Sequence, residues 1–191
     1  MRIDGREVRL GIALSHNTRH RAKEAYDAGI TYVENSLFDS RASVEEAVHN
    51  GAEIYDACKS ANLTPWSVHL PSGPIWYIDV LDEETRRGAI ENLTPVMRMA
   101  AAWEAKVLVV HGCGFASDKQ EELEASVDAC RRSLRELSLR AQGMSVAVEN
   151  LQRTPLEHSA QVKRFSGDCA GLCFDVNHLL HQSHEEFLKD L

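Results

Sequence analysis

The sequence lacks the features that would tie the protein to a membrane or to secretion. No apolar run approaches the roughly 18 residues that a membrane-spanning helix requires. Residues 1–7 lack the apolar core of a signal peptide. From the sequence we therefore expect a cytoplasmic protein that does not contact a membrane.

The sequence also lacks the cysteine patterns that form disulfide bonds or metal sites in small domains. Its five cysteines are an odd number, and no two of them have CxxC spacing. A disulfide framework and a thiolate zinc site are therefore both disfavoured, and we expect reduced, mostly buried thiols. The cysteines are Cys58, Cys113, Cys130, Cys169 and Cys173.

Positive charge is in short supply. The chain has 21 Lys and Arg residues against 29 Asp and Glu residues, which gives a formal net charge of −8 at pH 7. Proteins that bind nucleic acids usually neutralise phosphates with a basic surface. The balance of charge therefore argues against a general nucleic-acid binder, although it leaves room for a local basic groove.

A glycine-rich phosphate loop is missing as well. Such a loop normally follows the first strand of an open, doubly wound sheet that binds nucleotides. Here the first predicted strand covers residues 8–14, and residues 14–18 contain no glycine. This absence favours a closed barrel over an open sheet.

What the sequence does contain is a regular alternation of strand-like and helix-like segments. A length of 191 residues with 43% hydrophobic composition fits one domain, 1–191. Strict alternation predicts a parallel sheet with right-handed crossovers, and Ser43 with Glu46 predicts a capping box at one helix start. We predict strands at 8–14, 30–36, 64–70, 107–111, 144–149 and 170–175, and helices at about 18–28, 43–61, 82–105, 119–142, 155–165 and 184–191.

Four of these strands end on residues that can bind a metal. His69, His111 and Glu149 close three of them, and Asp175 closes a fourth and is followed by His178. In a parallel α/β barrel the active site lies at the carboxyl ends of the strands. Residues far apart in the sequence would therefore meet at one mouth.

The two faces of these strands differ in bulk. Side chains alternate between the faces of a strand, so Ala147 and Ser145 share the face of Glu149, while Val148 and Val146 take the other. The small residues thus accompany the candidate ligand. The bulky face suits packing against surrounding helices, as expected of a barrel strand that is buried on both sides.

Taken in order, four segments resemble the xylose isomerase-like barrel superfamily, which includes sugar phosphate isomerases and epimerases, ketose 3-epimerases, inosose dehydratases and endonuclease IV. The segments are 68–71 (VHLP), 109–112 (VVHG), 148–150 (VEN) and 174–178 (FDVNH). The resemblance covers nearly the whole chain and implies a (β/α)8 barrel. A glycine that the family has before the fourth strand appears here as Glu104 or Ala105.

The resemblance also implies a divalent metal at the mouth. The family's ligands are a glutamate and an aspartate at the ends of strands five and six, which Glu149 and Asp175 match, and a histidine and a glutamate from strands seven and eight. Only about six βα units are visible in this sequence. We therefore expect a C-terminally incomplete barrel.

The activity that the resemblance implies is isomerisation or epimerisation of a small sugar, ketose or polyol by metal-assisted proton transfer, with dehydration as a related outcome. Glu149 and His178 are the predicted catalytic residues, and Glu149 and Asp175 hold Mn²⁺, Mg²⁺, Co²⁺ or Zn²⁺. A homo-oligomer is also compatible with the sequence. Predicted substrate-binding residues are His69, His111, Glu34 and Trp76.

Each candidate also has a structural interpretation. Glu149 and Glu34 would then form ion pairs, and Asp175 would cap a helix with His178 exposed beside it. His69 and His111 would be buried, hydrogen-bonded histidines. Trp76 would pack its loop against the barrel instead of covering a sugar.

Two other functions remain open at this stage. Positions His69, His111, Glu149, Asp175 and His178 all match ligands of a multi-zinc nuclease of the endonuclease IV type, which would cleave damaged DNA. The acidic charge of the chain argues against that function. A barrel that binds a ligand without catalysis is the second alternative.

Overall fold

The computed structural model describes residues 2–3, 6–7, 10–39, 41–112, 119–152, 154–178 and 182–190. Cys113 and the first two residues of the predicted strand 8–14 lie outside these ranges. The four cysteines that the structure describes are free thiols. No helix among the described residues is both long and apolar enough to cross a bilayer.

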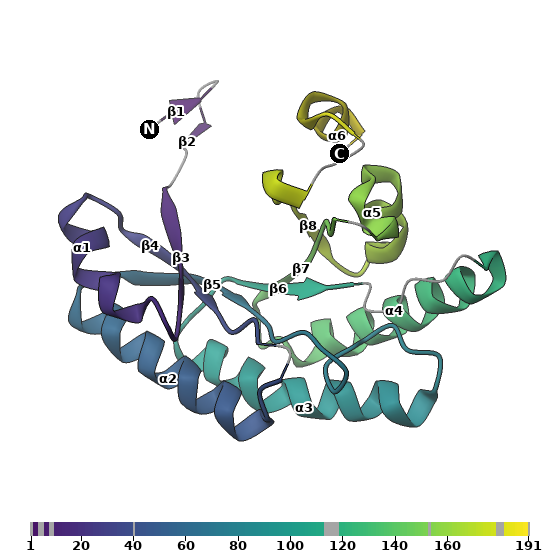
Figure 1. Ribbon diagram of the computed structural model, residues 1–191, viewed down its shortest axis with the longest axis horizontal. Helices are drawn as coiled ribbons and strands as arrows, with labels where there is room; N and C mark the ends of the chain where they lie inside the picture. The colour runs from purple at the N-terminus through teal and green to yellow at the C-terminus, as the bar shows by residue number, and fades with distance from the viewer. Residues whose placement is uncertain are drawn as a thin grey trace.

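A six-stranded parallel sheet forms the centre of the fold (Figure 1). Its strands lie in sequence order, and each pairs with the next in parallel, with one register shift between Val33 and Glu34. This arrangement confirms the expected run of about six βα units. The strands are β3 (Gly11–Ser15), β4 (Tyr32–Ser36), β5 (Thr64–His69), β6 (Val107–His111), β7 (Ser145–Glu149) and β8 (Gly171–Cys173).

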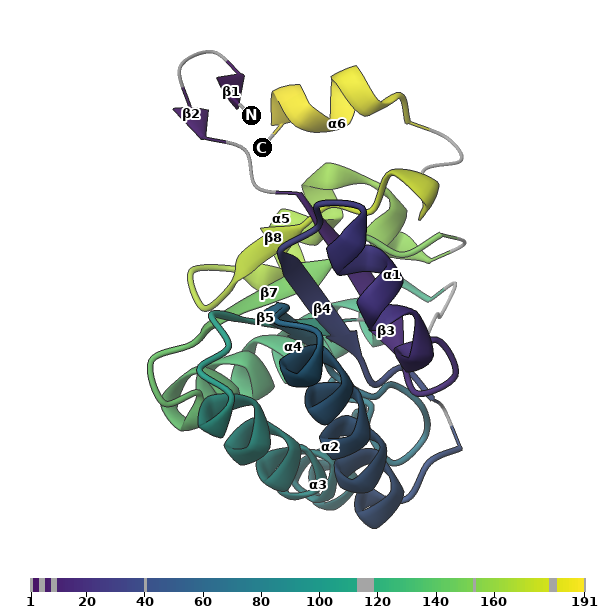
Figure 2. The ribbon, with the colours of Figure 1, turned by 90° about the vertical axis from the view of Figure 1, so that its left-hand side faces the viewer.

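Helices alternate with the strands as predicted. Helices α2, α3 and α4 lie side by side against one face of the sheet (Figures 1 and 2). The helix predicted at 18–28 is divided into a short 3-10 turn, η1, and α1. The bounds are η1 (Arg19–Arg21), α1 (Ala22–Asp27), α2 (Val44–Ser60), α3 (Glu83–Ala102), α4 (Gln120–Arg140), η2 (Pro155–Glu157), α5 (Ser159–Ser166), η3 (Val176–His178) and α6 (His184–Asp190).

One element was not expected from the sequence. Two short antiparallel strands, β1 (Arg2–Ile3) and β2 (Arg6–Glu7), form a hairpin before the sheet. The hairpin and α6 lie at the same end of the molecule in both views (Figures 1 and 2). Neither belongs to the six-stranded sheet.

Local sequence explains where the helices begin. The Ser43 hydroxyl accepts a hydrogen bond from the Glu46 amide at 3.2 Å, and the Glu46 carboxylate accepts one from the Ser43 amide at 2.8 Å. The predicted capping box of α2 is therefore confirmed. Asp82 caps α3 in a related way, because its carboxylate accepts a hydrogen bond from the Thr85 amide at 2.8 Å.

Helices α2, α3 and α4 end in a common way. The residue that starts each turn into the next strand has a left-handed backbone, with φ of 60° at Asn62, 59° at Glu104 and 51° at Gln142. Glycine is the residue that usually occupies this conformation after a helix. Glu104 thus stands at a turn where glycine is preferred.

The core lies between the sheet and the helices. Val68, Leu108 and Val148 are fully buried in it and come from the bulky faces of their strands. Val109 and Ala147 are also buried but take the opposite face, outside this cluster of core residues. The predicted difference between the two faces is therefore confirmed, and the narrow face is the one that carries the candidate ligands.

Candidate functional site

The carboxyl ends of the strands surround a pocket of about 270 Å³. Its lining comes from the ends of β4, β5, β6 and β7 and from the segment that follows β8. Parallel strands therefore bring together residues that are more than a hundred positions apart. The lining residues are Glu34, Ser36, Phe38, His69, His111, Glu149, Asp175 and His178.

Glu149 occupies the centre of this site. Its Oε2 atom lies 2.9 Å from Nε2 of His69 and 2.9 Å from Nε2 of His111. All three side chains are nearly buried, with 7%, 11% and 12% of their surfaces exposed. One carboxylate oxygen thus faces two imidazoles, and all three groups are largely shielded from solvent.

This arrangement shifts the pKa of each member. Burial raises the pKa of Glu149, but hydrogen bonds from His111 and His69 outweigh burial and bring the pKa down to about 2. Burial lowers the pKa of His69, yet the hydrogen bond and charge of Glu149 raise it above its ordinary value. The pKa of His111 is lowered, because burial and the positive charge of His69 outweigh the effect of Glu149.

Backbone carbonyls fix the orientation of two imidazoles. His69 Nδ1 donates to the Leu70 carbonyl at 3.2 Å, which turns Nε2 toward the centre of the site. His178 Nδ1 lies 2.7 Å from the Asn150 carbonyl, and its Nε2 lies 3.7 Å from the Asp175 carboxylate. Histidines that bind metals are commonly held by a hydrogen bond at the other ring nitrogen.

Asn150 is a site residue that the sequence did not single out. Its fully buried side chain donates to the Asp175 carbonyl at 2.9 Å and accepts from the Asp175 amide at 2.6 Å. Asn150 therefore fixes the segment that carries Asp175 and His178. Its place directly after Glu149 in the VEN segment was the available signal.

The described residues contain two groups that could hold a metal ion. One is His69, His111 and Glu149, and the other is Glu149, Asp175 and His178. Within each group the potential ligand atoms lie within 4.8 Å of one another. Imidazole nitrogens with carboxylate oxygens suit Zn²⁺, Mn²⁺ or Co²⁺, and fewer nitrogen ligands would suit Mg²⁺.

Phe38 follows the end of β4 and covers one side of the site. Its ring centroid lies 5.1 Å from that of His111 and 6.0 Å from that of His69, and 54% of the residue is exposed. Trp76 is the aromatic residue that the sequence predicts at the site. The structure instead buries Trp76 in the core, where it is 2% exposed, and the described lining of the pocket does not include it.

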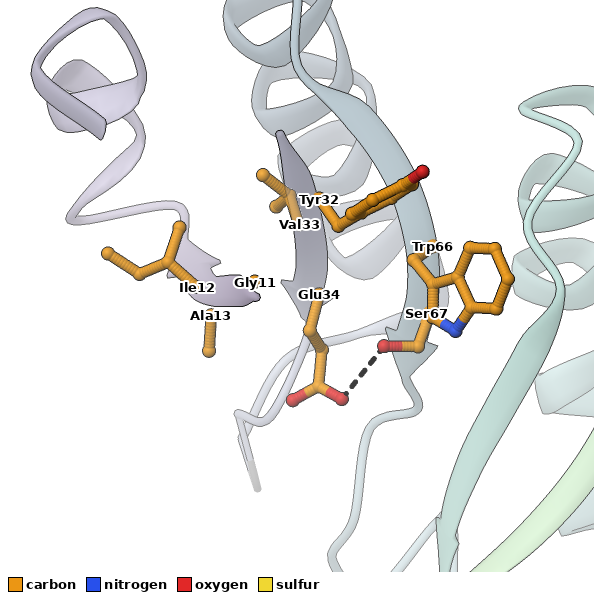
Figure 3. Close-up of a pocket in the computed structure, with 8 residues that line it drawn as sticks. All are labelled: Gly11, Ile12, Ala13, Tyr32, Val33, Glu34, Trp66 and Ser67. Carbon is orange, nitrogen blue, oxygen red and sulfur yellow. Dashed lines mark hydrogen bonds between the residues drawn. The ribbon is translucent and has the colours of Figure 1, made fainter. Parts of the chain in front are cut away.

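Glu34 also lines a larger cavity of about 660 Å³, together with residues of β3, β4 and β5 (Figure 3). The Ser67 hydroxyl donates to Glu34 Oε2 at 3.1 Å, so the described partner of Glu34 is a hydroxyl group. Tyr32 and Trp66 pack edge to face on the same cavity, with ring centroids 5.5 Å apart.

A family model described as a xylose isomerase-like TIM barrel matches residues 22–190. No curated protein matches the chain.

Solved structures share the fold at low sequence identity. A D-tagatose 3-epimerase-like protein is similar with a TM-score of 0.70 and 15% identity, over 90% of this chain and 66% of that protein. A 3-keto-D-glucoside 4-epimerase from E. coli gives 0.70 and 19%, over 96% and 75%. A family 2 AP endonuclease from Brucella melitensis gives 0.68 and 18%, over 95% and 74%. The chain thus spans about two thirds to three quarters of the length of these proteins.

Proposed function

The chain belongs to the xylose isomerase-like TIM barrel family, and on that premise we propose that it is a divalent-metal-dependent isomerase or epimerase of a small sugar, ketose or polyol. The observation that carries the proposal is the buried Glu149 carboxylate between His69 and His111, with Asp175 and His178 beside it. Epimerases among the structurally similar proteins support the choice of substrate class. We place this activity in the cytoplasm.

The donor set suits a divalent cation. Glu149 and Asp175 would hold it, in a group that also contains His178, while His69 and His111 form a second group around Glu149. Such a cation would polarise the oxygens of a bound sugar and make a neighbouring C–H or O–H more acidic. The pocket of about 270 Å³ has room for a small molecule.

Side chains of the protein would supply the charge, the proton transfer and the orientation of the substrate. The low pKa of Glu149 keeps its carboxylate charged at neutral pH, as a metal ligand must be. His178 is fixed at Nδ1 by Asn150, so Nε2 is the atom that exchanges a proton with a substrate hydroxyl. Glu34, held by Ser67, orients the substrate from the other side of the pocket.

Two measurements test the proposal. Metal analysis of the purified protein should give about one divalent ion per chain, and a panel of ketoses with Mn²⁺ should include one that is interconverted with its isomer or epimer. Glu149→Gln should abolish turnover and weaken Mn²⁺ binding. Glu157→Gln, a buried glutamate outside the pocket, is the matched control and should retain both.

The proposal fails if Glu149→Gln keeps wild-type turnover and metal content. It also fails if the metal-loaded protein binds no sugar of the panel. Thermal denaturation checks the fold of each variant, since a bound ligand raises the melting temperature of the folded state.

A second candidate is a nuclease that acts on abasic sites in DNA. The observation in its favour is that Glu149 is shared by two three-residue groups, which suits more than one zinc ion. Two observations oppose it. The net charge is −8, and the described pocket lining contains no Lys or Arg. Two or three zinc ions per chain, with cleavage of abasic-site DNA and no effect of any sugar, would favour the nuclease.

A third candidate is a barrel that binds a ligand without catalysing its conversion. The same experiments separate it from the other two. It predicts no bound metal, no turnover of sugars and no cleavage of DNA.

A further inference from the structure

Phe38 separates two recesses at the carboxyl ends of the strands. One is the pocket that contains Glu149, and the other is a smaller recess of about 140 Å³ between the turn after β3 and the start of α2. Ser36 and Phe38 line both recesses. A molecule longer than the first pocket would therefore cross the Phe38 ring to reach the second.

The Phe38 ring offers an apolar surface inside a polar site. It is 54% exposed, although its neighbours are the His69 and His111 rings and polar groups of the pocket. An exposed aromatic face next to hydrogen-bonding groups suits the C–H face of a sugar, because the ring packs against carbon while the polar groups bind the hydroxyls.

The second recess is polar without offering a free cation. His16, Asn17, Asp39 and Asn50 line it, and none of its described lining residues is Lys or Arg. His16 is engaged by Glu53 at 2.7 Å. A hydroxymethyl group fits this chemistry, whereas a phosphate would be repelled by the Asp39 carboxylate, the one acidic side chain among the described lining residues.

Two arginines lie close to the recess along the chain, Arg19 after the turn that follows β3 and Arg41 between the lining residues Asp39 and Ala42, and neither is among its described lining residues. Arg19 is engaged too. Its guanidinium lies 3.0 Å from the same Glu53 oxygen that His16 approaches. The charge of Arg19 is thus neutralised by a carboxylate outside the recess. Arg19 would have to leave Glu53 to balance an incoming phosphate.

We propose that Phe38 is a specificity-determining residue over which an uncharged, hydroxyl-bearing substrate chain lies, with its far end in the recess of His16, Asn17 and Asn50. This inference rests on the proposed sugar isomerase or epimerase function and adds to it that the substrate is a neutral sugar and not a sugar phosphate. The reacting end lies at Glu149.

Calorimetric titration of the whole protein tests the proposal. The probes are Mn²⁺ alone, then D-fructose, D-tagatose and D-fructose 6-phosphate with Mn²⁺ present. The variants are Phe38→Ala and Phe38→Leu, which remove the ring and its flat face. Tyr26→Ala is the matched control, because Tyr26 is an aromatic residue of α1 that is 44% exposed and outside both recesses.

We expect a neutral ketose to bind the wild type more tightly than the phosphate ester does. Phe38→Ala should weaken that binding about tenfold, while its affinity for Mn²⁺ stays within about twofold. The sugar affinity of Phe38→Leu should lie between those of the wild type and Phe38→Ala. The sugar affinity of Tyr26→Ala should match that of the wild type.

Each contrary result has a distinct meaning. Unchanged sugar binding in Phe38→Ala overturns the role of Phe38 and leaves the proposed function standing. Tighter binding of D-fructose 6-phosphate overturns the neutral recess. Binding of Mn²⁺ without any of the three sugars overturns this inference, and the proposed function then fails only if the metal-loaded protein binds no sugar of the wider ketose panel.

Discussion

At the scale of single residues, the site depends on one carboxylate. Glu149 Oε2 contacts two imidazoles, and the same side chain belongs to both groups that could hold a metal. A buried carboxylate is stable only when it is paired. His69 and His111 therefore support Glu149 in the metal-free protein.

This dependence predicts how the stability of the metal-free protein varies with pH. The pKa of Glu149 is about 2 in the folded protein, below the value of about 4.3 of a free glutamate. The unfolded chain therefore binds more protons in this interval, so the stabilisation is complete above about pH 4.3 and is lost as the pH falls toward 2. Urea denaturation of chelator-treated protein between these pH values should show a decreasing free energy of unfolding.

Glu149→Gln should make this acid dependence shallower, because the amide does not titrate. A carboxylate on the surface serves as the control, and Glu45→Gln on α2 should keep the wild-type slope. Equal slopes in the wild type and Glu149→Gln would show that the pKa of Glu149 is not depressed.

The sequence indicated the ligand-type residues but not their surroundings. Strand ends and parity located His69, His111, Glu149, Asp175 and His178, and the structure brings their side chains to one pocket. The same signals did not show that Phe38 lines the pocket or that Trp76 is buried in the core. Which aromatic residue reaches a pocket depends on how two loops pack, and loop packing leaves no periodic signal in the sequence.

At the scale of helices and strands, Ser43 fixes the start of α2. Ser43→Ala would remove one half of the capping box and leave the Glu46 amide without that partner. We expect a loss of about 1 kcal/mol in the free energy of unfolding. Ser60→Ala, at the exposed last residue of the same helix, should change stability far less.

Denaturant unfolding monitored by circular dichroism measures both variants. If Ser43→Ala and Ser60→Ala lowered the free energy of unfolding by equal amounts, the capping box would contribute nothing beyond general helix propensity.

The turn after α3 predicts a change of the opposite sign. Glu104 has φ of 59°, a conformation that strains a residue with a Cβ atom and costs glycine little. Glu104→Gly should therefore raise the free energy of unfolding by about 0.5–1 kcal/mol, because relief of strain outweighs the greater freedom of glycine in the unfolded chain.

Glu104→Ala separates backbone strain from the loss of the side chain. It removes the carboxylate but keeps the Cβ atom, so its stability should stay near that of the wild type. If Glu104→Ala raised the free energy of unfolding as much as Glu104→Gly, the effect would come from loss of the charge and not from relief of backbone strain.

Secondary structure followed from the sequence more closely than the site did. The alternation of strand-like and helix-like segments and the capping box located β3 to β8 and α2 to α5 within a few residues. The β1–β2 hairpin was missed, because strands of two residues are too short to show alternation. The division of 18–28 into η1 and α1 likewise depends on the tertiary structure.

At the scale of the whole molecule, the described sheet has two edges. Strands β3 and β8 each pair with one neighbour, so each leaves one row of backbone N–H and C=O groups without a strand partner in the described sheet. Leu10, directly before β3, is 57% exposed. The 191-residue chain should therefore self-associate through these edges at concentrations of about 10 µM and above.

Sedimentation velocity measures this association. Leu10→Lys should shift the protein toward the monomer, because a lysine beside an edge strand opposes strand pairing. Leu139→Lys, at an 88% exposed position on α4, is the control and should leave association unchanged. A wild type that stays monomeric over the whole concentration range would contradict the prediction.

The three left-handed residues after α2, α3 and α4 also bear on how such a chain can be recombined. Asn62, Glu104 and Gln142 occupy equivalent places in three successive units, each just before the next strand begins. Exchanging one unit for another at these residues would keep the alternation of faces in every strand. We therefore expect chimaeras joined at these three points to keep their ligand-bearing strand ends aimed at the same mouth, which makes the positions natural crossover points for gene shuffling within this fold.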